Sequence, residues 1–234
     1  MTWTVALVVD PGPFAPDSAL LMSVGLLGMA TVGMVGITVT GGRWAHRTSL
    51  VSVGAMLVLA VMRPIDVIWV AALIVSVLGG VILLSPSLTG AVRKVPPAVG
   101  PPSRAVLIPL LLIGLPFLLG LAAWDEQSIG TLVLGLGAPV AALWYARVLP
   151  GGLYAVRVLW PALGMGLAFT QRLAPAVVSL AAGVAIAVLA WHATVELAFH
   201  PPREVGTVHP MPPELAPGEV LDAANLDERG RPRR

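Results

Sequence analysis

Long apolar runs separated by short polar breaks make up most of this chain. An α-helix needs about 20 mostly apolar residues to cross the hydrocarbon core of a bilayer, and the runs are of that length. Most of the prolines, arginines and acidic residues lie in the breaks or near the two ends of the chain. The pattern predicts an all-α, polytopic integral membrane protein with seven transmembrane helices. The expected spans are about 18–40, 46–63, 65–85, 105–123, 128–146, 153–171 and 175–199.

Two breaks decide this count. The stretch 48–85 is too long for one span and is charged only at Arg63 and Asp66, so we place a tight turn at Pro64, which disfavours helix at the residue before it. The proline-rich stretch 90–104 is expected to be a stiff, extended linker, with a proline-motif ligand for a partner domain as the alternative. Prolines 109 and 116 predict a kinked fourth span.

The two ends of the chain differ from its middle. Residues 1–17 have no basic N-terminal region, and a proline soon follows their short apolar stretch. They are therefore expected to be an extracytoplasmic or interfacial lead-in and not a cleavable signal peptide. The seven-helix membrane domain is placed at 18–200. Residues 201–234 are rich in proline and charge, which predicts a disordered cytoplasmic tail.

Basic residues near the ends of the spans predict the orientation. Short cytoplasmic loops of membrane proteins carry an excess of lysine and arginine, so the more basic side is expected to face the cytoplasm, giving N-out/C-in. The expected cytoplasmic side receives Arg43, Arg47, Arg93, Lys94, Arg104, Arg147 and Arg157. The opposite side receives Arg63 and Arg172, together with Asp10, Asp17, Asp66, Asp125 and Glu126.

Composition supports a membrane class and excludes several others. The 234 residues are 57% hydrophobic and 11% charged, whereas a soluble domain carries about 25% charged residues. The formal net charge of +2 is spread over helix ends instead of one basic surface, so nucleic acid is not an expected partner. The chain has no cysteine, which excludes disulfides, thiolate nucleophiles and cysteine-bound metals.

The first span carries small residues on one face. This stripe includes Gly25, Gly33 and Gly36, which let another helix approach closely, as in small-xxx-small packing. We interpret these glycines as helix-packing residues. A substrate path along the same groove is the alternative. The full stripe is Ser18, Met22, Gly25, Met29, Gly33, Gly36 and Thr40.

An internal repeat is suggested at an offset of 110 residues. Gly41, Gly42, Ala45 and Arg47 match Gly151, Gly152, Ala155 and Arg157. Helices one to three would then repeat as five to seven in the same orientation, with helix four as a linker. This parallel 3+1+3 layout is similar to that of SWEET-type sugar carriers.

A likeness of layout carries no function with it. The expected spans contain no asparagine for a sugar to bond. Microbial rhodopsins have the same number of helices, but Lys94 is the only lysine and is expected in a loop, so no retinal Schiff base can form. The repeat would place Arg157 in the first turn of its helix, where its side chain can extend to the cytoplasmic surface.

One ionisable cluster falls within the expected spans. His192, Glu196 and His200 are spaced i, i+4 and i+8 on the seventh helix and would share one face. Two imidazoles and a carboxylate suit a divalent metal ion. His192 and Glu196 could alternatively relay an ion or a proton, or simply form a hydrogen bond that seats the end of the helix.

The sequence favours a protein without its own catalytic site. We expect a multi-pass plasma-membrane protein of bacterial type that serves as a packing or assembly subunit of a larger membrane complex, with lipid and other membrane subunits as partners. The alternative is a small-solute or ion transporter that uses the His192/Glu196 cluster. A membrane-embedded enzyme acting on lipid comes third, and it would need paired carboxylates, a metal or an activated nucleophile at membrane depth. The sequence identifies no cofactor.

Overall fold

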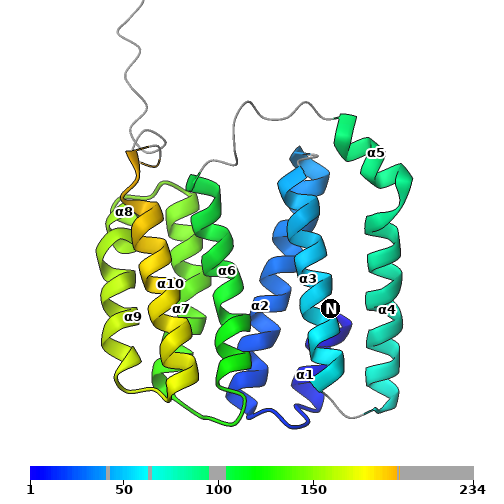
Figure 1. Ribbon diagram of the computed structural model, residues 1–234, viewed down its shortest axis with the longest axis horizontal. Coiled ribbons are helices and arrows are strands. Elements are labelled where there is room, and N and C mark those ends of the chain that lie inside the picture. Colours follow the sequence, from blue (N-terminus) through cyan, green and yellow to red (C-terminus); the bar gives the residue numbers. More distant parts are fainter. Residues whose placement is uncertain (41–42, 63–64, 95–103, 194, 196–234) are drawn as a thin grey trace, which may run out of the picture. The chain divides into compact units, whose positions relative to one another are not determined.

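The fold was analysed in a computed structural model that describes residues 1–40, 43–62, 65–94, 104–193 and 195. The chain divides into a unit Met1–Phe199 and a unit His200–Arg234, and the predicted tail falls in the second, outside the described residues. The regular elements of the described part are helices (Figure 1). They are α1 (Thr2–Val9), α2 (Pro16–Val35), the π-helical turn η1 (Gly36–Thr40), α3 (Arg43–Met62), α4 (Val67–Leu84), α5 (Pro86–Lys94), α6 (Arg104–Ala122), α7 (Ile129–Ala146), α8 (Gly152–Tyr154), the π-helical turn η2 (Ala155–Leu159), α9 (Trp160–Ala168) and α10 (Leu173–Ala190).

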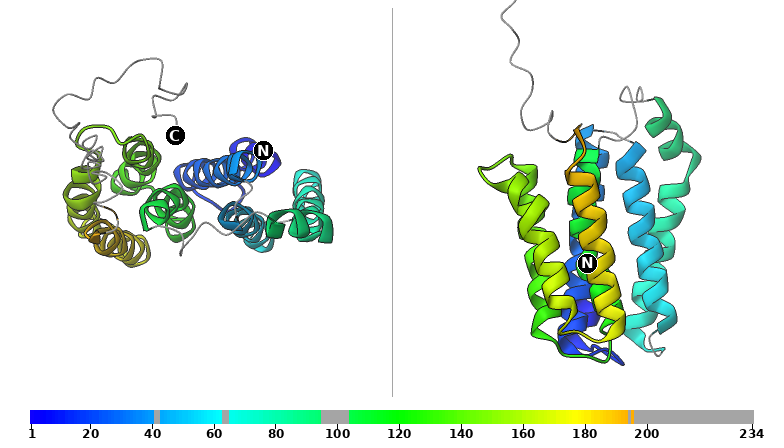
Figure 2. Two further views of the ribbon diagram at one scale, coloured as in Figure 1. Left: turned by 90° about the horizontal axis from the view of Figure 1, so that it is seen from above. Right: turned by 60° about the vertical axis from the view of Figure 1, so that its left-hand side comes forward.

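Successive long helices run in alternate directions when α8, η2 and α9 are counted as one helix between α7 and α10. The end of α2, the start of α3, and the short helices α5 and α8 lie at one end of the bundle (Figure 1). The turns that lead into α2, α7 and α10 lie at the opposite end. Viewed along the helices, α6 lies between α2 and the group formed by α7 and α10, and it contacts all three (Figure 2). The helix predicted to be a linker is therefore central.

Six described helices are long and apolar enough to cross a membrane, as expected of a multi-pass membrane protein. They correspond to the predicted spans one to five and seven. The expected sixth span, 153–171, is the shorter apolar helix Gly152–Ala168, formed by α8, η2 and α9. The long stretches are Pro16–Thr38, Arg43–Met62, Val67–Leu84, Ala105–Ala122, Ile129–Ala146 and Leu173–Ala190.

Several predicted boundaries need correction. The second span begins at Arg43 and not at 46, so the break left between the first two predicted spans, 41–45, is helical from Arg43 onward. The seventh span, predicted over 175–199, is α10, which begins at Leu173 and ends at Ala190. The turn at Pro64 lies outside the described residues, but α4 begins just after it. There the Asp66 carboxylate accepts a hydrogen bond from the backbone N of Trp69 at 2.5 Å, as an N-cap does.

The first stretch of the chain is packed into the bundle. Trp3, Ala6 and Leu7 of α1 are buried, and α1 contacts α2 and α4. The indole Nε1 of Trp3 donates a hydrogen bond to Oγ of Ser76 at 2.6 Å. The segment expected to be a lead-in thus contains a helix, because its apolar face finds a groove that the sequence pattern alone does not reveal. In the same way, the expected linker at 90–104 begins inside α5.

The glycines of α2 lie against neighbouring backbone. A Cβ atom on Gly25 would lie 2.5 Å from the backbone N of Phe117 in α6, and one on Gly120 of α6 would lie 2.7 Å from the carbonyl oxygen of Ser18. Only hydrogen fits at these positions, so the backbones of α2 and α6 pack directly on each other. Nearer the other end of α2, Gly33 and Gly36 lie equally close to α3, against Ser49 and Ala45.

Two apolar clusters form the core. One includes Trp3, Met22 and Phe117 and is built on α1 to α4 with one face of α6, and the other includes Leu112, Leu134 and Ile186 and is built on α6, α7, α9 and α10 with Leu21 of α2. Ile113 of α6 packs against both. The contact between α2 and α6 is therefore the seam that joins the two parts of this unit.

Candidate functional site

The predicted cluster on the last helix is only partly within the described residues. His192 follows the end of α10 and is half-buried, while Glu196 and His200 lie outside the described residues. α10 ends before His192, so this helix does not itself carry the predicted i, i+4, i+8 spacing. Within the described part, no group of three or more His, Cys, Asp or Glu side chains could hold a metal ion. The metal and relay hypotheses stay predictions.

Among the described residues near His192 in the sequence, Ala190 and Trp191 are contacted by Arg157. Its Nε donates a hydrogen bond to the carbonyl oxygen of Ala190 at 2.9 Å. Its guanidinium carbon lies 4.9 Å from the ring centroid of Trp191, a cation–π distance. The last carbonyls of a helix have no partner within the helix and favour positive charge, so Arg157 caps the C-terminus of α10.

Arg157 is therefore placed differently from the prediction. We expected its side chain to extend along the lipid to the membrane surface. It lies instead in the π-helical turn η2, half-buried, and it faces α10. A carbonyl and an aromatic ring together give the charge a favourable site near apolar surroundings, where an isolated arginine would be costly. The neighbouring Tyr145, at the end of α7, is 3% exposed.

The turn between α7 and α8 is tightly constrained. Val148 has φ 52°, a left-handed conformation that is costly for a β-branched residue. Gly151 has φ 80°, which glycine adopts without strain. The indole Nε1 of Trp144 donates a hydrogen bond to the carbonyl oxygen of Pro150 at 3.0 Å and holds the turn closed. This rigid turn delivers η2, and with it Arg157, to the end of α10.

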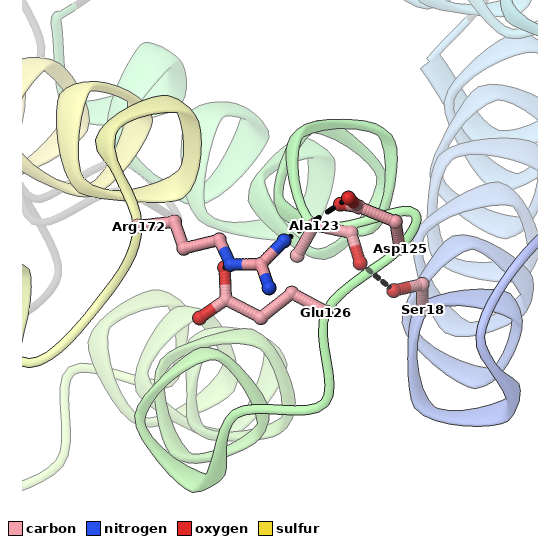
Figure 3. Close-up of polar contacts among 5 residues, drawn as sticks. All are labelled: Ser18, Ala123, Asp125, Glu126 and Arg172. Atoms are coloured by element: carbon pink, nitrogen blue, oxygen red, sulfur yellow. Dashed lines mark hydrogen bonds and ion pairs between the residues drawn. The ribbon is translucent and has the colours of Figure 1, made fainter.

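A second polar group lies at the opposite end of the bundle (Figure 3). Nη1 of Arg172, just before α10, lies 3.1 Å from Oδ2 of Asp125, just after α6, and Nε of the same arginine lies 4.0 Å from Oε2 of Glu126. Ser18 at the start of α2 donates a hydrogen bond to the carbonyl oxygen of Ala123. These contacts join three turns. Arg172 and Asp125 are well exposed, so their ion pair contributes little to stability.

Inside the described spans, the fully buried polar side chains are hydroxyls: Ser18, Ser23, Ser52, Ser76, Thr131 and Ser179. Several form hydrogen bonds within the bundle: Ser76 donates to the carbonyl oxygen of Ala72 at 2.7 Å, and Oγ of Ser179 accepts from the side-chain amide nitrogen of Gln171 at 2.9 Å. Hydroxyls can orient helices and exchange hydrogen bonds, but they need a neighbouring base before they act as nucleophiles. Where such a hydroxyl bonds to another segment, as Ser76 does with Trp3 of α1 and Ser18 with Ala123, it joins two parts of the bundle.

The class that these observations define is an all-helical protein whose helices are apolar enough for a multi-pass membrane protein. Comparisons with protein-family models, with curated proteins and with solved structures find no match to this chain. Function must therefore be argued from the chain's own surfaces and contacts.

The sequence did not predict the hydrogen-bond partner of Arg157 or the two π-helical turns. The offset match with Arg47 placed Arg157 near one end of its helix, but it gave no partner, because the partner is a backbone carbonyl 33 residues away in the sequence. The Trp191–His192 pair after a long apolar run was a usable signal for the end of that helix. The π-helical turns left no pattern that we could recognise.

Proposed function

We propose that this protein is a non-catalytic subunit of a larger membrane complex of the bacterial plasma membrane, and that helices of its partners pack on α3 and α4. The observation that carries the proposal is the open space around Gly54 and Gly79. A Cβ atom on either glycine would meet nothing within 4 Å. By contrast, the glycines of the predicted stripe in α2 are closed off by α6 and α3.

An open glycine, one with empty space beside it, on an apolar helix favours contact with a partner helix over contact with lipid. Glycine in a helix costs about 1 kcal/mol relative to alanine, so an open glycine weakens its own helix unless close approach by a neighbour offsets the loss. Val51 and Val58 flank Gly54 on an exposed face, and Val75 and Leu78 are exposed near Gly79. Only 11% of the α4 span is buried, against 44% for the first span. A partner would cover this surface.

Replacing the open glycines tests the proposal. We expect Gly54→Leu and Gly79→Leu to leave the thermal midpoint of the purified protein within about 2 °C of the original, since the new side chains enter empty space and surface changes have small effects. We expect both to reduce co-purification of the partner subunits in mild detergent. Gly166→Leu on α9 is the matched control, because Gly166 is equally open. Unchanged co-purification in both test variants, or equal loss in the control, would contradict the proposed interface.

We also infer seven crossings with the N-terminus outside and the C-terminus inside. The ion pair between Asp125 and Arg172 joins the turn before α7 to the turn before α10, so these two helices start from the same end. If both cross, the chain must return through Gly152–Ala168. Its 17 residues reach about 25 Å at 1.5 Å per residue, near the lower limit for a span. The contacts of α6 with α2 and α7, the first helix of each triplet, support the 3+1+3 layout.

Single cysteines can test this topology because the natural chain has none. Cysteines at Gly12 and Asp125 are expected to react with a membrane-impermeant maleimide added outside intact cells. Cysteines at Ser87 and Gly151 are expected to react only after the membrane is opened. The same four variants labelled in detergent give the control for intrinsic reactivity. Labelling of Gly151→Cys from outside would overturn the crossing of α7. A cysteine at Thr170 should label from outside if Gly152–Ala168 crosses, and its protection in intact cells would overturn the seven-span topology.

A further inference from the structure

A basic cavity lies at the end of the bundle, where α3 begins and α4 ends. Its volume is about 510 Å³, within the range of small-molecule sites, and it is open to one side. It is lined by Arg43, His46 and Arg47 of α3 and by Thr89 and Val92 of α5. None of these residues takes part in the surface proposed above for partner helices.

The fold brings the three basic side chains together by simple helix geometry. Arg43, His46 and Arg47 occupy positions i, i+3 and i+4 in the first turn and a half of α3, so they share one face. Nε2 of His46 lies 2.7 Å from the carbonyl oxygen of Leu83. A carbonyl only accepts hydrogen bonds, so Nε2 carries the proton and donates. This bond ties the start of α3 to the last turn of α4.

Helix α5 closes the second wall of the cavity. Ser85 has an extended conformation and interrupts the helix between α4 and α5, and its Oγ accepts a hydrogen bond from the backbone N of Leu88 at 3.4 Å. The chain therefore bends, and α5 turns Thr89 and the buried Val92 toward α3. Val92 gives this wall an apolar part and Thr89 gives it a hydroxyl.

The chemistry of the lining fits a phosphate group. The two guanidinium groups offer planar sets of donors that match phosphate oxygens, and Thr89 adds a hydroxyl. The lining residues that the structure describes include no acidic one. No hydrogen bond or ion pair to another described residue engages Arg47, so its donors are available. Arg47 can therefore donate to an anionic group in the cavity, with the positive charge of Arg43 in the same lining.

The position of the cavity favours a lipid as the source of the phosphate. It lies beside the first residues of one candidate span and just past the last residues of another, at the level where spans meet water. Val81, Ile82 and Leu84 at the adjoining end of α4 are exposed and apolar. We propose that this cavity binds the phosphate of an anionic phospholipid headgroup, whose acyl chains lie along the apolar surface of α4. Basic pockets at the ends of spans recognise headgroups in this way.

The test uses the full chain in nanodiscs or detergent, with phosphatidylglycerol as the probe and phosphatidylcholine as the neutral comparison. Arg43→Gln combined with Arg47→Gln is expected to lower the affinity for phosphatidylglycerol by roughly thirtyfold, since each basic residue near a membrane surface contributes about a fivefold effect. Arg147→Gln removes one positive charge at the same end but outside the cavity, and is expected to leave the affinity unchanged, whereas Arg43→Gln or Arg47→Gln alone should each lower it. Arg43→Lys with Arg47→Lys should restore part of the binding.

Three outcomes would overturn the proposal. Equal loss in Arg147→Gln would mean a general surface-charge effect, and equal binding of the two lipids would mean that the cavity does not select an anionic headgroup. Inorganic phosphate forms the third arm: if it binds as tightly as the lipid and displaces it, the cavity is a free-phosphate site. Circular dichroism and the retained binding of the lysine variant guard against misfolding. Co-purification of partners is measured in the same variants, so failure here is distinguishable from failure of the subunit proposal.

Discussion

Replacing Gly25 by alanine is expected to lower the free energy of unfolding by about 3 kcal/mol, the upper part of the range for overpacking substitutions. The added methyl group would lie 2.5 Å from the backbone N of Phe117 and 2.9 Å from its Cα. No rotamer change moves backbone atoms, so α2 and α6 must separate, and they form the seam between the two apolar clusters. Thermal unfolding in one fixed detergent, followed by circular dichroism, should show a midpoint lower by roughly 6–12 °C.

Two matched variants make this result interpretable. Gly114→Ala adds the same methyl group to α6 where nothing lies within 4 Å, and it should not lower the midpoint, because alanine is the better helix former. The methyl group added by Gly28→Ala would lie 2.7 Å from Cγ2 of Ile113, which is a side-chain atom. In the background of Ile113→Ala, Gly28→Ala should therefore cost much less stability than it does in the original protein. Combining Gly25→Ala with Phe117→Ala should not recover stability. Equal midpoints for Gly25→Ala and Gly114→Ala would refute the direct backbone contact.

The positions of the long helices followed from local pattern. An apolar run of spanning length, ended by proline, glycine or charge, indicates its own boundary. Six predicted spans contain a long apolar helix, although the last of these helices ends at Ala190 and not at 199. The same reasoning could not find α1, because a short apolar helix is stabilised only by the groove that receives it. It also misjudged the start of the 90–104 linker, because α5 begins with a local contact, in which Oγ of Ser85 accepts from the backbone N of Leu88, and continues to Lys94.

Small residues illustrate a second limit of the sequence. The periodic stripe on α2 was visible as a packing surface, but nothing in the pattern told whether α6, α3 or another protein would fill it. The structure has the chain's own helices against Gly25, Gly33 and Gly36, which moves the argument for partners to Gly54 and Gly79. Whether a stripe of small residues packs within the chain or against a partner depends on which helices come into contact, and such contacts join residues that are far apart in the sequence. The basic cavity was hidden for the same reason, as its walls come from α3 and α5.

Arg157→Gln is expected to lower the free energy of unfolding by about 2–4 kcal/mol. A hydrogen bond to a charged group is worth about 1.5–3 kcal/mol and a cation–π contact about 0.5–2 kcal/mol, and Arg157 makes one of each with the end of α10. Glutamine loses the charge that favours the helix C-terminus and cannot cover the ring of Trp191. The measurement is the unfolding midpoint, together with protection of the α10 backbone amides in hydrogen exchange.

A double-mutant cycle separates the two contacts. If the ring contact matters, Arg157→Gln and Trp191→Leu should be non-additive by about 1 kcal/mol, whereas Arg157→Gln and Gly114→Ala should add. Arg157→Lys keeps the charge but not the planar donor geometry, so its stability should lie between the original and Arg157→Gln. Arg147→Gln, on an exposed side chain at the same end, should change stability by less than about 0.5 kcal/mol. If Arg147→Gln and Arg157→Gln lost stability equally, the effect would reflect total charge at this end of the bundle, and α10 would be held by apolar packing alone.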